Sequence, residues 1–252
     1  SVARAYRTPD FNELYSNGPH LAANAYEVGD PSLRSETGTG FDAFLRVNRE
    51  RVRVETAVFR NRLDDFITSS SRGRAILSSQ GQPLFQFTNE DAVFSGVEGE
   101  VEWNITRTVA LDVTVSHVQA RFTNDRPPIP VFTITDVSID TTYVPASRFP
   151  ALIPPTNGRI ELHHDGPRLH GSVGARVAAR QDRTGDFESP TPGYGVGFAT
   201  VGYRFLHRDQ FHAVTLRVDN ILDTEYREHL SRIKEIMPEP GRNVSLLYRL
   251  SF

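Results

Sequence analysis

The sequence predicts an all-β chain folded as an antiparallel transmembrane β-barrel meander. Three observations favour this fold class. Apolar and polar residues alternate with period two, short turns alternate with long connections along the chain, and many strands carry one charged face.

Alternation locates the strands, because successive side chains on a strand point to opposite faces. In residues 97–104, Val97, Val101 and Trp103 alternate with glutamates, and residues 244–252 have an apolar side chain at every second position. No stretch has a convincing helical period with caps, so we expect no substantial helix. In chain order, the predicted strands are residues 1–6, 35–47, 52–69, 84–103, 108–122, 146–163, 168–182, 195–206, 211–219 and 243–252.

The connections between these strands are of two kinds. Short polar turns are predicted at 48–51, 104–108, 164–168 and 207–210. Long connections rich in Pro, Gly, Asn, Asp and Ser are predicted at about 7–34, 70–83, 123–145, 184–193 and 220–242. Because alternate connections of a meander lie at opposite ends of its strands, we expect all short turns at one end, together with the C-terminus.

A soluble β-sandwich is the main structural alternative. Sandwiches have connections of mixed length at both ends, whereas outer-membrane barrels have short periplasmic turns and long extracellular loops. Charged strand faces such as the one with Glu98 and Glu100 would be costly in a dry core but are tolerable in a wet lumen. Trp103 lies beside a short turn, where an interfacial aromatic residue belongs. The pattern therefore favours the membrane barrel.

The composition excludes several classes of function. The 252 residues carry a net charge of −3, so the chain has no general nucleic-acid footprint. Cysteine is absent, which excludes disulfides, thiol catalysis and zinc–thiolate sites. No run approaches the ~18 apolar residues of a membrane helix. The spacing of Ser, His and Asp assembles no catalytic group, and we expect no enzyme activity and no cofactor.

Four segments together resemble the C-terminal part of TonB-dependent receptors. They are "ARAYRTPDFNELYSNGPHLAANAYEVGDPSLRSETG", "ETAVFRNRLDDFI", "AVFSGVEGEVEW" and "LRVDNILDTEYREHLSRIKEIMPEPGRNVSLLYRLSF". Each is weak alone, but their order and spacing are specific, and the resemblance runs over essentially all of residues 1–252. The segments at 188–197 and 226–243 are also similar to receptors for metal or haem-type uptake, including zinc receptors.

The resemblance implies a fold and a transport function. The chain would supply about ten C-terminal strands of a roughly 22-stranded barrel, as a single partial domain with the plug domain and the TonB box absent. We expect a location in the bacterial cell outer membrane, in contact with lipid and lipopolysaccharide. The implied function is uptake of a metal or metal chelate (a ferric siderophore, haem or zinc), energised by the TonB–ExbB–ExbD complex through the missing N-terminal part.

Candidate ligand-binding residues lie in the long connections. Imidazole and carboxylate groups bind metals, and guanidinium groups bind the carboxylates of haem or siderophores. The candidates are Arg7, His20, Glu27, Arg227, His229 and Arg232. We expect both histidines to face outward, although solvated loop residues, salt bridges or lipopolysaccharide contacts are the alternatives. The sequence selects no metal.

Two further groups of residues have roles implied by the resemblance. Glu98, Glu100, Arg176, Arg180 and Arg217 would face the lumen, where the arginines would pair with plug carboxylates. Tyr248, Leu250 and Phe252 would be read by the barrel-assembly machinery, after which the last strand would pair with the first. A passive outer-membrane channel or an adhesin barrel is the second hypothesis for function, and a soluble β-rich binding domain is the third.

Overall fold

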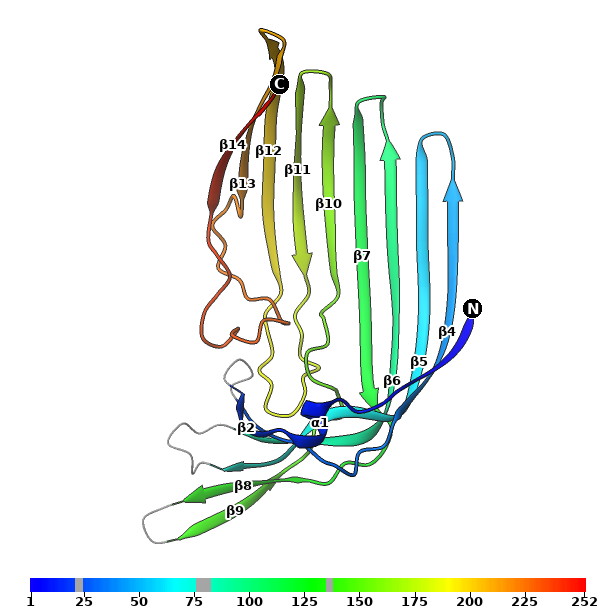
Figure 1. Ribbon diagram of the computed structural model, residues 1–252, viewed down its shortest axis with the longest axis vertical. Helices are drawn as coiled ribbons and strands as arrows, with labels where there is room; N and C mark the ends of the chain where they lie inside the picture. The colour runs from blue at the N-terminus through cyan, green and yellow to red at the C-terminus, as the bar shows by residue number, and fades with distance from the viewer. Residues whose placement is uncertain (21–24, 76–82, 135–137) are drawn as a thin grey trace.

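A computed structural model describes residues 1–20, 25–75, 83–134 and 138–252 as one curved antiparallel sheet with folded connections at one end (Figure 1). Among the described residues, ten strands follow one another in this sheet in chain order. They are β1 (Val2–Arg7), β4 (Glu36–Asn48), β5 (Val52–Ala75), β6 (Leu84–Asn104), β7 (Val109–Phe122), β10 (Asn157–Asp165), β11 (Leu169–Ala178), β12 (Tyr194–His207), β13 (Gln210–Asp219) and β14 (Asn243–Ser251).

The predicted ten-strand meander is confirmed, with corrections at some ends. The strand predicted at 146–163 begins only at Asn157, because Pro150, Pro154 and Pro155 lack the N–H groups that a ladder needs. The strand predicted at 168–182 ends at Ala178. Within the described residues β1 pairs only with β4 and β14 only with β13, so the sheet is not closed and the expected pairing of last with first strand is not made within this chain.

The long connections contain more regular structure than the sequence predicts. The first holds a one-turn helix α1 (Phe11–Tyr15) and the strands β2 (Asn17–His20) and β3 (Ala25–Val28), and the third holds the hairpin β8 (Ile129–Ile134) and β9 (Ile139–Val144). Asp10 caps α1 by accepting from the Glu13 N–H at 2.9 Å, and Glu13 accepts from the Asp10 N–H at 2.8 Å. This capping box explains the helix in the absence of an amphipathic period. No helix among the described residues is long and apolar enough to cross a membrane.

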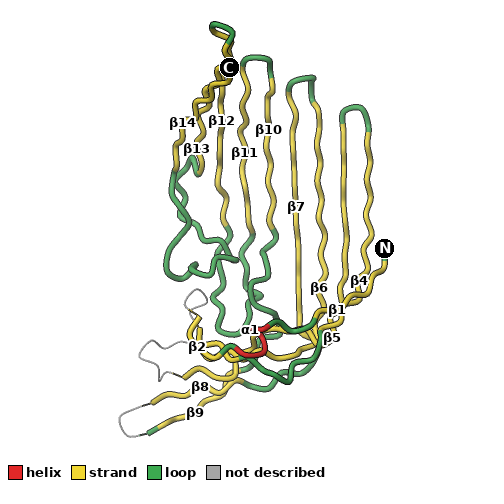
Figure 2. The backbone as a smooth tube through the Cα atoms, viewed as in Figure 1, coloured by secondary structure: helices red, strands yellow, loops and turns green. Residues whose placement is uncertain are grey.

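The two ends of the sheet differ as predicted. The turns that join β4 to β5, β6 to β7, β10 to β11 and β12 to β13 lie at one end, and the long connections gather at the other (Figures 1 and 2). The C-terminus lies at the short-turn end (Figure 1). We call the opposite end the loop end.

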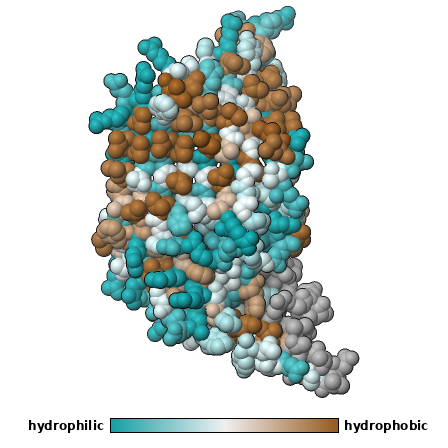
Figure 3. All heavy atoms as spheres, turned by 180° about the vertical axis from the view of Figure 1, so that it is seen from behind, coloured by the Kyte–Doolittle hydropathy of each residue, from teal (hydrophilic) through white to brown (hydrophobic). Residues whose placement is uncertain are grey.

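The register aligns apolar side chains into rows that cross the sheet. One row runs through Val52, Trp103, Leu111, Leu162, Val173, Ala199, Val218 and Val244. A neighbouring row runs through Val54, Val101, Val113, Ile160 and Ala175. We call the face that carries these rows the outer face. Figure 3 shows apolar side chains gathered in a band across the molecule.

Apolar residues of the outer face are solvent-accessible and not packed in a core. Val173 is 54% exposed, Val177 51% and Leu246 72%, and Val97 and Leu216 are exposed as well. Neighbouring rows are two residues apart, about 7 Å along the strands, so about four rows would fill the ~25 Å apolar band of an outer-membrane barrel. A soluble β-domain would bury these side chains, so that alternative is not supported.

The outer face generates a test of lipid contact. Val173→Arg should destabilise the membrane-inserted protein by about 2–4 kcal/mol, because the guanidinium would lie in hydrocarbon. Ser172→Arg is the matched control, since Ser172 lies on the opposite face beside His163, and it should change stability by less than about 1 kcal/mol. Urea unfolding of each full-length variant in lipid vesicles measures the difference. Equal costs for the two variants would contradict the assignment of the faces.

Candidate functional site

A cavity of about 530 Å³ lies at the loop end, between the sheet and the connections. Among the described residues, seven phenylalanine side chains line it: Phe66, Phe85, Phe87, Phe94, Phe122, Phe149 and Phe187. The connection before β10 adds residues 150–153, and the last long connection adds Ser231, Arg232 and residues 234–236. The cavity is therefore built by strands and by three separate connections.

A β-bulge places Phe66 of β5 on the same face as Phe94 of β6. Leu63 is opposite Ala92, but Phe66 is opposite Glu90, so β5 contains one extra residue. The bulge is accommodated at Asp65, whose φ is 57°. The Asp65 N–H donates a hydrogen bond to the Asp91 carboxylate at 3.1 Å. The extra residue turns Phe66 to the face of Phe94, and the two rings meet edge to face at 5.5 Å. Beyond the bulge, β5 and β6 bend across the loop end (Figure 1).

The first buried ion cluster holds the connections behind the cavity. Arg126 pairs with Asp186 at 2.5 Å, and its Nε lies 3.6 Å from the Glu90 carboxylate. All three side chains are less than 10% exposed. Arg126 also donates to the Ser147 carbonyl at 2.5 Å and lies 4.5 Å over the Phe122 ring. Because a buried unpaired charge is costly, this cluster ties together strand β6, both arms of the long connection between β7 and β10, and the connection that carries Asp186.

The second buried ion cluster joins the last long connection to its neighbours. The Glu188 carboxylate lies 2.9 Å from Lys234 Nζ and 3.1 Å from His229 Nε2. It also accepts from the N–H groups of Gly185 at 2.8 Å and Leu152 at 3.2 Å. Lys234 is the only lysine in the sequence. We call Glu188, His229 and Lys234 the Glu188 clamp.

The contacts of the Glu188 clamp keep its carboxylate charged. Burial by itself raises the pKa of Glu188, but the adjacent His229 imidazole and the hydrogen bonds from the Gly185 N–H and Lys234 outweigh burial and lower the pKa to about 2. The stabilisation from this carboxylate is therefore complete above an unfolded pKa of about 4.3 and is lost as the pH falls through about 2.

The structure places the predicted ligand-binding residues in different surroundings. Arg7 pairs with Glu13 at 2.8 Å and Glu36 at 3.3 Å, and His20 lies 3.0 Å from Glu27. Glu27 and Arg232 line the cavity, and the other four candidates do not.

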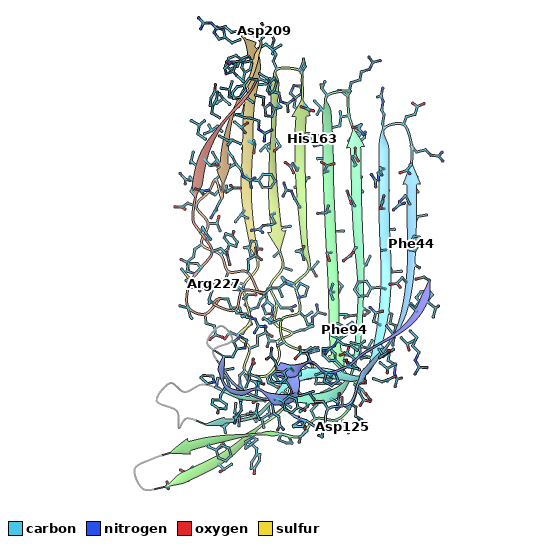
Figure 4. The ribbon with its side chains drawn as sticks, in the orientation of Figure 1. Phe44, Phe94, Asp125, His163, Asp209 and Arg227 are labelled. Carbon is cyan, nitrogen blue, oxygen red and sulfur yellow. The ribbon has the colours of Figure 1, made fainter. Side chains whose placement is uncertain are left out.

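The expected outward position of His229 is wrong, because its side chain is fully buried in the Glu188 clamp. Arg227 lies in the last long connection (Figure 4) and donates to the Lys234 carbonyl, while its Nη2 is 3.7 Å from Glu225.

Arg232 differs from the other cations around the cavity. Its residue is exposed, and the described residues supply it with no ion pair. Lys234 is neutralised by Glu188, and the nearby Arg126 is neutralised by Asp186. An aromatic cavity with one unpaired guanidinium suits an organic ligand that carries an anionic oxygen. No group of three or more His, Asp or Glu side chains gathers to hold a metal ion in the part of the chain described by the structure.

Four of the five predicted lumen residues, Glu98, Glu100, Arg176 and Arg217, lie on the inner face, which is opposite the apolar rows, and Arg180 lies beyond the end of β11. Glu98 and Glu100 line a second cavity of about 360 Å³. Arg176 pairs with Glu228 at 3.0 Å and contacts the Tyr226 hydroxyl at 3.1 Å, so the last long connection folds over this face. Arg180 pairs with Asp182, and Arg217 with Asp219, each at two residues' distance along the chain. These arginines have acidic partners within the chain, and contact with a plug stays a prediction.

Sequence reasoning missed the phenylalanine cavity and the Glu188 clamp. The phenylalanines belong to three strands and two connections, and a bulge decides the side on which Phe66 lies, so no local pattern marks the group. A compositional signal did exist for the clamp. A single lysine in a chain with otherwise only arginine as a basic residue is a distinctive position.

Comparison with known proteins identifies the family. Residues 1–221 match the family described as "TonB dependent receptor-like, beta-barrel". Among solved structures, the copper transporter OprC has a TM-score of 0.74 at 23% identity, over 98% of this chain and 35% of that one. The FrpB iron transporter from Neisseria meningitidis (F3-3 variant) has a TM-score of 0.60 at 18% identity, over 88% and 31%. The siderophore receptor PirA from Pseudomonas aeruginosa has a TM-score of 0.59 at 17% identity, over 100% and 38%.

The chain thus spans about a third of the length of these solved structures, and identities this low show a shared fold. The family match covers most of the chain. The protein therefore belongs to the TonB-dependent receptor β-barrel family, whose members lie in the outer membrane of Gram-negative bacteria.

Proposed function

We propose that this chain is part of a receptor that captures an organic metal chelate and imports it with energy from the TonB–ExbB–ExbD complex. The observation that carries the proposal is the phenylalanine-lined cavity at the loop end, with Arg232 as its unpaired cation. Aromatic walls would contact the body of the chelate, and the guanidinium would bind an anionic oxygen of it. Loop-end residues face the external medium in an outer-membrane barrel.

Three features support a chelate over other cargoes and functions. The cavity combines seven phenylalanine side chains with a few charged groups, which suits an organic ligand better than a hydrated metal ion. The absence of a metal-ligand cluster in the described ranges also favours a chelate over bare zinc or copper. A passive channel or adhesin would need no such cavity. We also propose that Tyr248 and Leu250 on β14, with Phe252 directly after it, serve as the assembly signal, since β14 is exposed along its whole length.

Uptake by a deletion strain tests the proposed cargo. Cells that lack the full-length receptor should lose uptake of an iron-labelled aromatic chelate such as a ferric tris-catecholate, and expression of the receptor should restore it. Restoration should fail in a strain without TonB. Uptake of haem, a ferric hydroxamate, zinc and copper is measured in the same strains for comparison. Receptor-dependent uptake of a bare ion alone, or uptake that persists without TonB, would contradict the proposal.

Substitution of the unpaired cation tests the site itself. Arg232→Ala should weaken binding of the ferric tris-catecholate about 10-fold or more, because a charge-assisted hydrogen bond contributes about 1.5–3 kcal/mol. Arg208→Ala is the control, since Arg208 lies in the turn between β12 and β13 at the other end of the sheet, and it should bind as tightly as the unaltered receptor. Titration of each purified full-length receptor gives the dissociation constants. An unchanged constant for Arg232→Ala would remove this residue from the site.

A further inference from the structure

The segment that carries Arg232 has little regular structure of its own. Residues 228–237 form successive turns, with backbone hydrogen bonds such as Ser231 N–H to the Glu228 carbonyl at 3.1 Å and Lys234 N–H to the Ser231 carbonyl at 3.2 Å. No strand of the described sheet pairs with this segment. Its position must therefore come from side-chain contacts.

Two side chains anchor the segment on the same carboxylate. His229 Nε2 lies 3.1 Å from Glu188 Oε1, and Lys234 Nζ lies 2.9 Å from the same oxygen. The side chains of the three residues are 0–7% exposed. Because His229 and Lys234 flank residues 230–233 on both sides, the clamp holds Arg232 between two fixed points.

Further hydrogen bonds hold the three side chains of the Glu188 clamp in place. His229 Nδ1 lies 2.9 Å from the Thr191 hydroxyl, and Lys234 Nζ donates to the His229 carbonyl at 3.1 Å. Glu188 itself is held by the backbone N–H groups of Gly185 and Leu152. A Cβ added at Gly185 would lie 2.6 Å from the Ala151 Cβ, so the two connections that carry these N–H groups are in close contact. The clamp therefore fixes the position of Arg232 relative to a packed part of the cavity wall.

We infer that Glu188, His229 and Lys234 are positioning residues that hold Arg232 at the phenylalanine-lined cavity for binding of the chelate's anionic group. This inference rests on the proposed function for its ligand, but the geometry of the clamp does not depend on any ligand. Neither His229 nor Glu188 needs to touch the chelate in this arrangement. Their contribution to affinity passes through Arg232.

Proteolysis tests the clamp without a ligand. In outer membranes that contain the full-length receptor, an arginine-specific protease should cleave after Arg232 at least 10-fold faster in Glu188→Gln and in Lys234→Met than in the unaltered receptor. Glu225→Gln is the matched control, because Glu225 belongs to the same connection but is 75% exposed and makes only a 3.7 Å contact. Unchanged cleavage in both clamp variants, at normal receptor levels in the membrane, would overturn the inference.

A double-mutant cycle separates positioning from general stability. With the ferric tris-catecholate as probe, Arg232→Ala and Glu188→Gln should each weaken binding about 10-fold, and the double variant should also be about 10-fold weaker, because both changes remove the same contact. A loss of about 100-fold in the double variant would overturn the positioning role. If Glu188→Gln is cleaved faster but Arg232→Ala binds the chelate normally, the clamp does hold the segment, but Arg232 is not part of the proposed binding site.

Discussion

The whole structure depends on one constraint: each strand must present apolar side chains to hydrocarbon on one face and polar side chains to water on the other. The register aligns these faces into continuous rows, such as the row that passes through Trp103, Leu162 and Val173. On the inner face, arginines pair with carboxylates two residues away, as Arg217 does with Asp219. Several charges of the inner face are thereby neutralised within single strands, and the sheet requires no dry core.

The second constraint applies at the loop end, where water meets both faces and the rows end. Here the chain builds a conventional packed interior from connections. The bulge at Asp65 turns Phe66 inward, and Phe85 and Phe87, from the part of β6 beyond the bulge, line the same cavity. The cavity is thus a product of an irregularity in the ladder, a common origin for sites on β-sheets.

Buried charges hold this interior together because its segments have few backbone contacts with one another. Arg126 connects β6 with two connections, its own between β7 and β10 and the one that carries Asp186, and Glu188 connects the last long connection with two others. Each cluster is costly to leave incomplete, so it defines one arrangement of the connections among many that hydrophobic contact alone would allow. Arg232 stands out against this background as a cation that the described structure leaves free for a ligand.

The sequence by itself determined the ten-strand meander, its two unlike ends and the faces of the strands, because an alternation of period two is a local property of the chain. It also carried the resemblance that the family match confirms. Only the tertiary structure decided which loop residues meet. His229 lies buried on Glu188, 41 residues away in sequence, and the phenylalanines converge from three strands and two connections. Such contacts depend on long-range packing and on a single bulge, and neither leaves a periodic trace in the sequence.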